Sequence, residues 1–335
     1  MSDRALVTGG AGFIGSHLVD CLVAEGFAVT VLDNFATGTM DNLRHACQKG
    51  DVRVIDGSIL DRSAVTEAIV ECGVVYHLAV ECVRRSLGKP IENHEVNATG
   101  SLYVLEAARR ANVSRFVYCS SSEVYGNTSD GPLNERATLC EPMTVYGAGK
   151  LAGEYYTKAY HRTYGLPAVV VRPFNSYGPR EHDSGDLAEV IPRFVIRVIN
   201  GLPPVIFGSG ENSRDFTYVT ETARGLMLAA RCNALIGREV NLAYGRNVSV
   251  LELARAIASL SGRPLEPIHL PPRPGDVAHL HADTRLANDV LGFQAEINLE
   301  TGLSKYLAWF SETYPNPSVL LEESPVNWSM PERGL

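Results

Sequence analysis

The feature that most constrains this chain is a glycine-rich turn near its start. Ala5-Leu6-Val7-Thr8 predicts a short buried strand, and Gly9, Gly12 and Gly15 follow it, with Gly10 completing a G-x-G-x-x-G spacing. Such glycines permit a tight bend, let the backbone approach a pyrophosphate and let the next helix pack closely on the strand. The helix then directs its positive amino-terminal end toward the phosphates. The motif predicts a dinucleotide site, although an unrelated glycine-rich turn is the alternative.

An acidic residue follows at the end of the second predicted strand. Val29-Thr30-Val31-Leu32 leads directly to Asp33. In a dinucleotide-binding unit a carboxylate at this place accepts hydrogen bonds from the adenine ribose and repels a 2′-phosphate. We therefore expect NAD rather than NADP as the cofactor.

Strand and helix patterns alternate over the first half of the chain. This alternation predicts an α/β fold, in which a Rossmann-type, doubly wound parallel sheet has helices on both faces. Proline and glycine punctuate the second half, which predicts a smaller carboxy-terminal substrate lobe. The expected strands are 29–33, 52–55, 74–78, 116–119, 168–171 and 205–207, and the expected helices are 13–24, 61–72, 93–112, 146–164, 187–200, 249–261 and 299–313.

The composition shift suggests a division into lobes. Residues 1–175, joined by 211–245, are expected to form the dinucleotide-binding domain. Residues 176–210 and 246–314 are expected to form the nucleotide-sugar lobe, followed by a loosely ordered, proline-containing tail at 315–335. Ligands of open parallel sheets bind beyond the carboxyl ends of the strands, so the cleft between the lobes is the expected active site.

Composition narrows the classes of partner. A net charge of −8 argues against a nucleic-acid-binding surface, and no apolar run is long enough to predict a membrane span. Seven cysteines without C-x-x-C spacing suggest reduced thiols in a cytoplasmic protein, and we expect no metal site. The first residues lead straight into the predicted strand, so we expect no signal peptide.

Two further segments carry candidate catalytic groups. Tyr146 and Lys150 share one face of a predicted helix, where the ammonium would favour the phenolate and allow Tyr146 to act as a general base. Ser120-Ser121-Ser122-Glu123 follows directly on the predicted strand 116–119. A hydroxyl there could bridge a substrate oxygen and Tyr146. The alternatives are an exposed helix face and a cluster of turn serines.

Together these motifs resemble the extended short-chain dehydrogenases/reductases of the nucleotide-sugar epimerase/dehydratase family, and most closely the UDP-glucose 4-epimerase type. The resemblance extends from about residue 4 to 312. It is carried by Gly9–Gly15, Asp33-Asn34, His77-Leu78-Ala79, Asn97, Ser120–Gly126, Tyr146 and Lys150, Arg172–Asn175, Arg214–Phe216 and Arg273–Asp276.

The resemblance implies a role for each matching residue. Ser121, Tyr146 and Lys150 would be catalytic, with Ser122 and Glu123 beside them. Cofactor contacts are implied for Gly9, Gly12, Phe13, Ile14, Gly15, Asp33, Asn34, Ser58, Ile59, Leu78, Ala79, Asn97, Tyr146 and Lys150, and substrate contacts for Arg85, Ser121, Asn175, Val190, Val205, Phe207, Arg214, Arg273 and Asp276. Arg214 and Arg273 would clamp the substrate diphosphate, while Val205 and Phe207 would hold the nucleotide base.

The family shares oxidation at sugar C4 and then divides by outcome. Return of hydride to the other face makes a 4-epimerase, which is our first expectation, with a UDP-linked sugar as the substrate. A 4,6-dehydratase or a glucuronate decarboxylase is the alternative. Ser122-Glu123 replaces the Asp-Glu pair of typical dehydratases, which speaks against the standard dehydratase, but a Ser-Glu pair also resembles glucuronate decarboxylases and some aminosugar dehydratases. Arg84 or Arg85 could receive a glucuronate carboxylate. A non-catalytic dinucleotide-binding protein is less consistent with the retained Tyr146 and Lys150.

Helices 93–112 and 146–164 carry apolar positions beyond one face. In the family two such helices pair with a second copy as a four-helix bundle, so we expect a homodimer.

Overall fold

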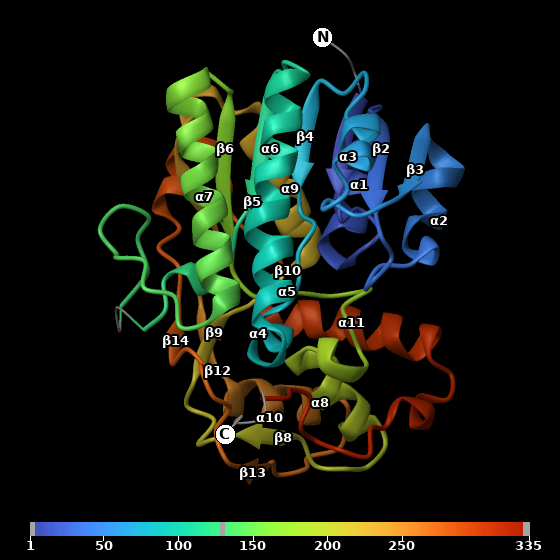
Figure 1. The fold of residues 1–335 in the computed structure, drawn as a ribbon. Coiled ribbons are helices and arrows are strands. Elements are labelled where there is room, and N and C mark those ends of the chain that lie inside the picture. Colours follow the sequence, from blue (N-terminus) through green and yellow to red (C-terminus); the bar gives the residue numbers. More distant parts are fainter. Residues whose placement is uncertain (1–3, 128–130, 331–335) are drawn as a thin grey trace, which may run out of the picture.

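A seven-stranded parallel sheet forms the centre of the protein (Figure 1). The computed structural model describes residues 4–127 and 131–330, so the first three and last five residues of the predicted domains and tail lie outside it. The strand order is β11-β6-β5-β4-β1-β2-β3, which confirms the predicted Rossmann-type α/β fold. The strands are β1 (Arg4–Thr8), β2 (Ala28–Asp33), β3 (Val52–Asp56), β4 (Val74–His77), β5 (Arg115–Cys119), β6 (Ala168–Pro173) and β11 (Glu239–Leu242).

Both faces of the sheet are covered, because the inner strands carry apolar side chains on both sides. In β5, Val117 faces one core while Phe116 and Tyr118 face the other, as side-chain alternation along a strand requires. The first core receives α1 (Phe13–Ala24), α2 (Met40–Lys49) and α9 (Val219–Arg231). The second receives α3 (Arg62–Ala68), α6 (Ser101–Arg110) and α7 (Val145–Tyr164). None of the helices in the described ranges is long and apolar enough to cross a membrane.

The segment from β4 to β5 is more broken than the sequence suggested. The predicted helix 93–112 consists of α5 (Pro90–His94), a π-helical turn η1 (Glu95–Gly100) and α6. Before it lies a short helix, α4 (Val83–Gly88), where the sequence indicated only a loop. This helix extends beyond the sheet edge toward the smaller lobe (Figure 1).

The smaller lobe has its own apolar core. It is built from α8 (Val190–Ile199), α10 (Val250–Leu260) and α11 (Leu299–Thr313). Three small sheets complete it and join it to the larger lobe: β8 (Val205–Phe207) with β13 (Ile268–Leu270), β9 (Ser213–Asp215) with β12 (Asn247–Ser249) and β14 (His279–Leu280), and β7 (Ser176–Tyr177) with β10 (Thr217–Tyr218).

Two segments cross between the lobes. Between the stretches that form the smaller lobe, the chain returns to the sheet: α9 packs on α1 and β11 pairs with β6. The end of the chain forms a 3₁₀ turn, η6 (Pro317–Leu320), and then runs back across the smaller lobe with Asn327 buried. The structure thus gives residues 315–330 defined contacts where the sequence suggested loose order.

A buried ion pair fastens α7 to the sheet. Arg172 of β6 donates from Nε and Nη2 to the two oxygens of Glu154, at 2.8 and 2.6 Å, and both side chains are almost fully buried. Ser120 donates to Glu154 at 2.6 Å, and Arg172 Nη1 donates to the hydroxyl of Tyr125 at 2.8 Å. Every member of the group has a partner, so α7, β6 and the end of β5 are held together.

We expect Glu154→Gln to destabilise the protein by about 3–5 kcal/mol, because it leaves the Arg172 guanidinium buried without a counter-charge. The matched control is Glu67→Gln, whose partner Arg53 is 47% exposed, and which should cost at most about 1 kcal/mol. Urea denaturation followed by circular dichroism measures both. Equal losses in the two variants would contradict the role given to the buried pair.

Candidate active site

A cavity of about 300 Å³ lies at the carboxyl ends of the central strands, and the glycine turn forms its floor. Gly9 has a φ of +69°, a left-handed conformation that favours glycine. A Cβ on Gly15 would lie 2.1 Å from the carbonyl oxygen of Gly9, so only glycine allows α1 to begin this close to β1. The backbone N–H groups in the first turn of α1 have no carbonyl partner within the helix. They can therefore donate hydrogen bonds to a bound anion.

Asp33 lies at one end of this cavity, at the end of β2. Its two carboxylate oxygens accept hydrogen bonds from the N–H groups of Ala11, at 2.8 Å, and Phe35, at 2.9 Å. Burial raises the pKa of Asp33, and these two hydrogen bonds oppose the rise. The carboxylate is therefore held in place with oxygen lone pairs left for a ligand. The predicted cofactor residues that line the cavity are Gly9, Gly12, Phe13, Ile14, Gly15, Asp33, Asn34, Ser58, Ile59, Leu78, Ala79, Tyr146 and Lys150.

A buried chain of hydrogen bonds holds the wall formed by Leu78 and Ala79. The hydroxyl of Thr8 accepts from both of their N–H groups at 3.2 Å and contacts Nδ1 of His77 at 2.7 Å. Nε2 of His77 contacts the Ser101 hydroxyl at 2.9 Å, and that hydroxyl donates onward to a carbonyl. The pattern requires a neutral ring with its proton on Nε2. Burial agrees with this, because it lowers the pKa of His77 to about 3.

The structure places Asn97 behind this wall rather than on the cavity surface. Its side-chain oxygen accepts from the N–H of Glu81 at 2.9 Å, and its amide nitrogen donates to the carbonyl of Glu81 at 3.0 Å. Asn97 therefore holds the loop after β4. The cofactor contact that the resemblance implies for Asn97 stays a prediction.

Tyr146 and Lys150 lie on the cavity side of α7, facing the loop after β5. Lys150 is buried, and its Nζ donates to the carbonyl of Cys119 at 2.8 Å. Burial lowers the pKa of Lys150 to about 8 and raises that of Tyr146, while a hydrogen bond with Ser121 lowers the latter. The geometry brings together the three groups that the sequence singled out.

Ser122 and Glu123 form a 3₁₀ turn, η2 (Ser122–Val124), directly after Ser121, and both line the same cavity. Burial raises the pKa of Glu123, although the charges of Arg214 and Arg273 lower it. Glu123 is therefore a buried carboxyl group with a raised pKa on the same cavity lining as Tyr146 and Ser121.

A second cavity, of about 180 Å³, extends into the smaller lobe. Asp276 accepts at Oδ1 from Arg214, at 2.8 Å, and from Arg273, at 2.7 Å, which orients both guanidinium groups. These cations lower the pKa of Asp276 despite its burial. The predicted substrate residues on this surface are Asn175, Val190, Val205, Phe207, Arg214, Arg273 and Asp276.

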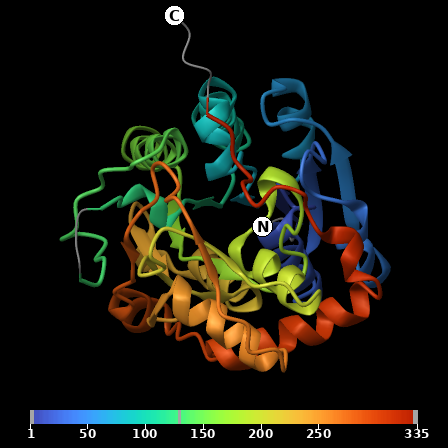
Figure 2. The same ribbon diagram turned by 90° about the horizontal axis from the view of Figure 1, so that it is seen from below.

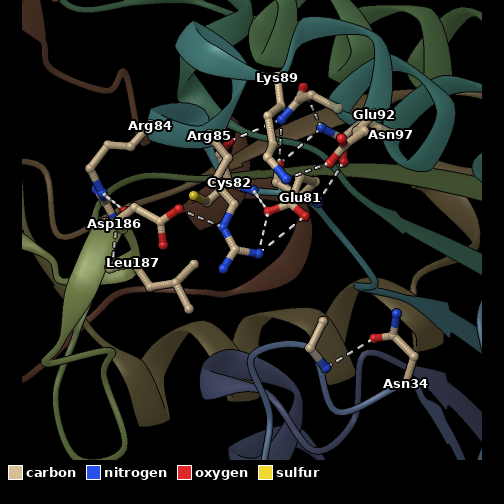
Figure 3. A network of polar contacts seen from close by, with 12 residues as sticks. Asn34, Glu81, Cys82, Arg84, Arg85, Lys89, Glu92, Asn97, Asp186 and Leu187 are labelled. Carbon is tan, nitrogen blue, oxygen red and sulfur yellow. Dashed lines mark hydrogen bonds and ion pairs between the residues drawn. The ribbon is translucent and has the colours of Figure 1, made fainter. Parts of the chain in front are cut away.

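Arg84 lines both cavities, whereas the predicted Arg85 lines neither of them. Arg85 turns toward Asp186, to which its Nε donates at 2.8 Å, and pairs with Glu81 at 3.4 Å (Figure 3). Arg84 is buried, donates from Nε to the carbonyl of Asp186 at 2.7 Å, also donates to the carbonyl of Leu187, and lies 3.7 Å from Glu189. The two arginines are neighbours on α4, so only the orientation of this unpredicted helix distinguishes them.

The two cavities meet at a common wall. Val83, Arg84, Glu123, Asn175 and Glu189 line both of them. The side-chain oxygen of Asn175 is buried and has no hydrogen-bond partner among the described residues, so it is free to accept from a ligand. A molecule held by the arginines of the second cavity would reach this wall beside Tyr146 and Ser121.

Comparison with known proteins agrees with this geometry. The family model for the NAD dependent epimerase/dehydratase family matches residues 5–243. The chain belongs to this family. The UDP-glucose 4-epimerase of Mycolicibacterium smegmatis is 36% identical over 92% of this chain and 98% of its own length. The dTDP-glucose 4,6-dehydratase of Streptomyces niveus is 33% identical over 92% of this chain and 93% of its own length.

Among solved structures, the UDP-glucose 4-epimerase of Thermotoga maritima, determined with UDP-glucose, has a TM-score of 0.87. It is 33% identical, over 92% of this chain and 99% of that one. The protein is thus an NAD-dependent enzyme of the epimerase/dehydratase family. Its first cavity fits NAD in three ways: a phosphate site at the start of α1, a close backbone approach at Gly15, and a carboxylate at Asp33. Within the described ranges, no group of three or more metal-ligating side chains could hold a metal ion.

We expect Asp33→Asn to weaken NAD binding by about tenfold, the scale of one charge-assisted hydrogen bond. We also expect the ratio of the affinity for NAD to the affinity for NADP to fall. Asp56→Asn is the matched control, because Asp56 lies opposite Asp33 on β3 but is exposed and lines neither cavity. Calorimetric titration with NAD and NADP measures both. An unchanged ratio of the two affinities in Asp33→Asn would contradict the assignment.

Proposed function

We propose that this protein is a nucleotide-sugar 4-epimerase that acts on a UDP-linked sugar through a transient 4-keto intermediate. The observation that carries the proposal is the common wall of the two cavities. It would place the sugar of a substrate anchored by Arg214 and Arg273 between the cofactor cavity and Tyr146. The relatives named UDP-glucose 4-epimerase support the same activity.

The proposal gives each lobe one ligand. Residues 1–175 with 211–245 would hold NAD. Residues 176–210 with 246–314 would hold the nucleotide diphosphate, together with Arg214 from the returning segment. The arginine pair suits a diphosphate, because planar guanidinium groups bind phosphate oxygens with two parallel hydrogen bonds. The predicted cytoplasmic location is supported by the seven cysteines, all of which are free thiols.

In the proposed reaction Tyr146 removes the proton from the sugar 4-hydroxyl. The hydroxyl of Ser121 is hydrogen-bonded both to the Tyr146 oxygen and to the sugar oxygen. NAD held in the first cavity would supply the hydride acceptor for C4 and the hydride donor for the opposite face of the resulting ketone. The hydrogen bond with Ser121 opposes the rise in the pKa of Tyr146 that burial causes. The ammonium of Lys150, four residues along the same helix, would favour the phenolate by its positive charge. Tyr146 then returns the proton to the new hydroxyl.

The surroundings of Arg84 favour a neutral sugar over a glucuronate. Two backbone carbonyls already accept hydrogen bonds from its guanidinium, and Glu189 lies 3.7 Å away as a counter-charge. A substrate carboxylate at this place would meet an arginine that is already neutralised. This favours epimerisation over decarboxylation.

Glu123 supports the second candidate, a 4,6-dehydratase. Its raised pKa lets it hold a proton that could be given to a leaving hydroxyl. Against this, the neighbouring position is Ser122, a buried hydroxyl in place of the aspartate of typical dehydratases.

Mass spectrometry of the products separates these outcomes. The enzyme is incubated separately with UDP-glucose, UDP-N-acetylglucosamine and UDP-glucuronate, with NAD present. We expect an unchanged mass and a new chromatographic peak, and we expect Glu123→Gln to keep this product. Loss of water, or of carbon dioxide from the glucuronate, would overturn the epimerase proposal and assign Glu123 a part in the chemistry.

We expect Tyr146→Phe to lower turnover by about 10²–10⁴-fold, the usual contribution of a general base. Lys150→Met should shift the acidic limb of the pH–rate profile upward, because loss of the ammonium raises the pKa of Tyr146 and a base works only above its pKa. Tyr155→Phe, on the exposed side of the same helix, is the control. A full-rate Tyr146→Phe enzyme would exclude the mechanism.

We also propose that two copies pair through α6 and α7, which lie side by side on the outside of the sheet (Figure 1). Tyr155 and Tyr164 of α7 are 62% and 58% exposed, a large apolar area for a free surface. Light scattering at micromolar concentration should give twice the mass of one chain, and Tyr155→Arg should lower it. A monomeric wild-type protein would contradict the pairing.

A further inference from the structure

The end of the chain contributes Asn327 and Trp328 to the lining of the second cavity. Figure 2 shows the ribbon of residues 315–330, in red, running from η6 past α8 toward α4. Asn327 anchors this segment: its buried amide accepts from Nη1 of Arg193 at 2.9 Å and donates to the carbonyl of Ala188, also at 2.9 Å. Arg193 also donates to the carbonyl of Pro325. The segment is thus held by specific contacts to the lobe that surrounds the cavity.

These contacts place Trp328 on the cavity wall. Its ring meets Phe207 of β8 edge to face, with centroids 4.6 Å apart at 77°. The next residue, Ser329, covers Gly88 of α4, where a Cβ would lie 2.3 Å from the serine hydroxyl oxygen. The tail therefore bridges the strand of the smaller lobe and the helix that carries Arg84.

The lining of this cavity combines two kinds of side chain. Arg193, Arg197, Arg214 and Arg273 supply positive charge, and Val205, Phe207 and Trp328 supply apolar and aromatic surface. A nucleoside diphosphate needs both, cations for its diphosphate and a flat apolar surface for its base. About 180 Å³ remains open with Trp328 in place, so the indole lines the cavity rather than filling it.

We propose that Trp328 is a wall of the nucleotide-base pocket and that Asn327 positions it, so that the tail takes part in binding and selecting the nucleotide. This inference rests on the proposed function, because it takes a nucleoside diphosphate as the occupant of the second cavity. Arg193 is part of the support. Burial lowers the pKa of Arg193 to about 10, which is still far enough above neutral pH for the guanidinium to stay charged. This guanidinium lies 5.8 Å from the centre of the Phe207 ring.

The chain offers a direct reporter of this pocket. It has two tryptophans, Trp309 and Trp328, so Trp309→Phe leaves Trp328 as the single emitter. UDP, dTDP, GDP and ADP are titrated separately into this variant. We expect the diphosphate that binds to change the Trp328 fluorescence, because its base lies against the indole.

Calorimetry on Trp328→Ala then measures the contribution of the ring. We expect its affinity for the preferred diphosphate to fall about tenfold or more, the scale of one base–aromatic contact, while NAD affinity stays unchanged. Trp328→Phe should keep most of the affinity. Val326→Ala, at an exposed position of the same tail, is the matched control and should bind as the wild type does.

The outcomes separate this inference from the epimerase proposal. If Trp328→Ala binds the diphosphate as tightly as the wild type or more tightly, the role of Trp328 in the base pocket is overturned. A higher affinity would mean that the ring obstructs the pocket. The epimerase proposal would still stand if the enzyme turns over a UDP-sugar. Weaker binding by Trp328→Ala in an enzyme that epimerises no UDP-sugar would keep the wall and remove the proposed activity. If none of the four diphosphates binds the wild-type protein, both are overturned.

Discussion

The site depends on the buried pair of Glu154 and Arg172. α7 carries Tyr146 and Lys150, while Ser121 follows β5, so the catalytic geometry requires a helix and a strand end to stay in register. The pair supplies this, since Arg172 bonds both oxygens of Glu154 and Ser120 bonds one of them. Burying two charges carries a large desolvation penalty. The ion pair and its hydrogen bonds offset much of this penalty only when Glu154 and Arg172 lie in this one arrangement. The interaction thus selects a position for α7 rather than simply adding stability.

The sequence predicted the parts of the fold whose causes are local. A strand, a glycine turn and a helix lie within a few residues of one another, so α1 begins and ends where the sequence predicts. Ser121 was predicted in the same way, because a polar cluster that follows a buried strand lies at the carboxyl edge of a parallel sheet. Tyr146 was predicted from its four-residue spacing to Lys150, which places both on one face of a helix. Gly153 adds a tertiary reason for close packing, since a Cβ there would lie 2.1 Å from the hydroxyl of Tyr118.

What the sequence did not predict depends on contacts between distant segments. Arg84 and Arg85 have the same chemistry, and which of them faces the cavity depends on the rotation of α4 against the loop at Asp186. Asn97 matched a motif, yet its amide is used by the backbone of Glu81. The tail shows no periodicity, and its order comes from Asn327 and Arg193, far apart in the chain. Neither composition nor local sequence pattern predicts such contacts between distant residues.

The charges around Glu123 connect substrate binding to its protonation. Burial favours its neutral form, whereas Arg214 and Arg273 favour its charged form, and Asp276 partly offsets them. A substrate diphosphate bound to these arginines would neutralise the charge that lowers the pKa of Glu123. Substrate binding would therefore raise the pKa of Glu123 further and favour its neutral form, which can donate a hydrogen bond. In the proposed reaction this leaves Tyr146 as the base, so that the neutral Glu123 can orient a hydroxyl without competing for its proton.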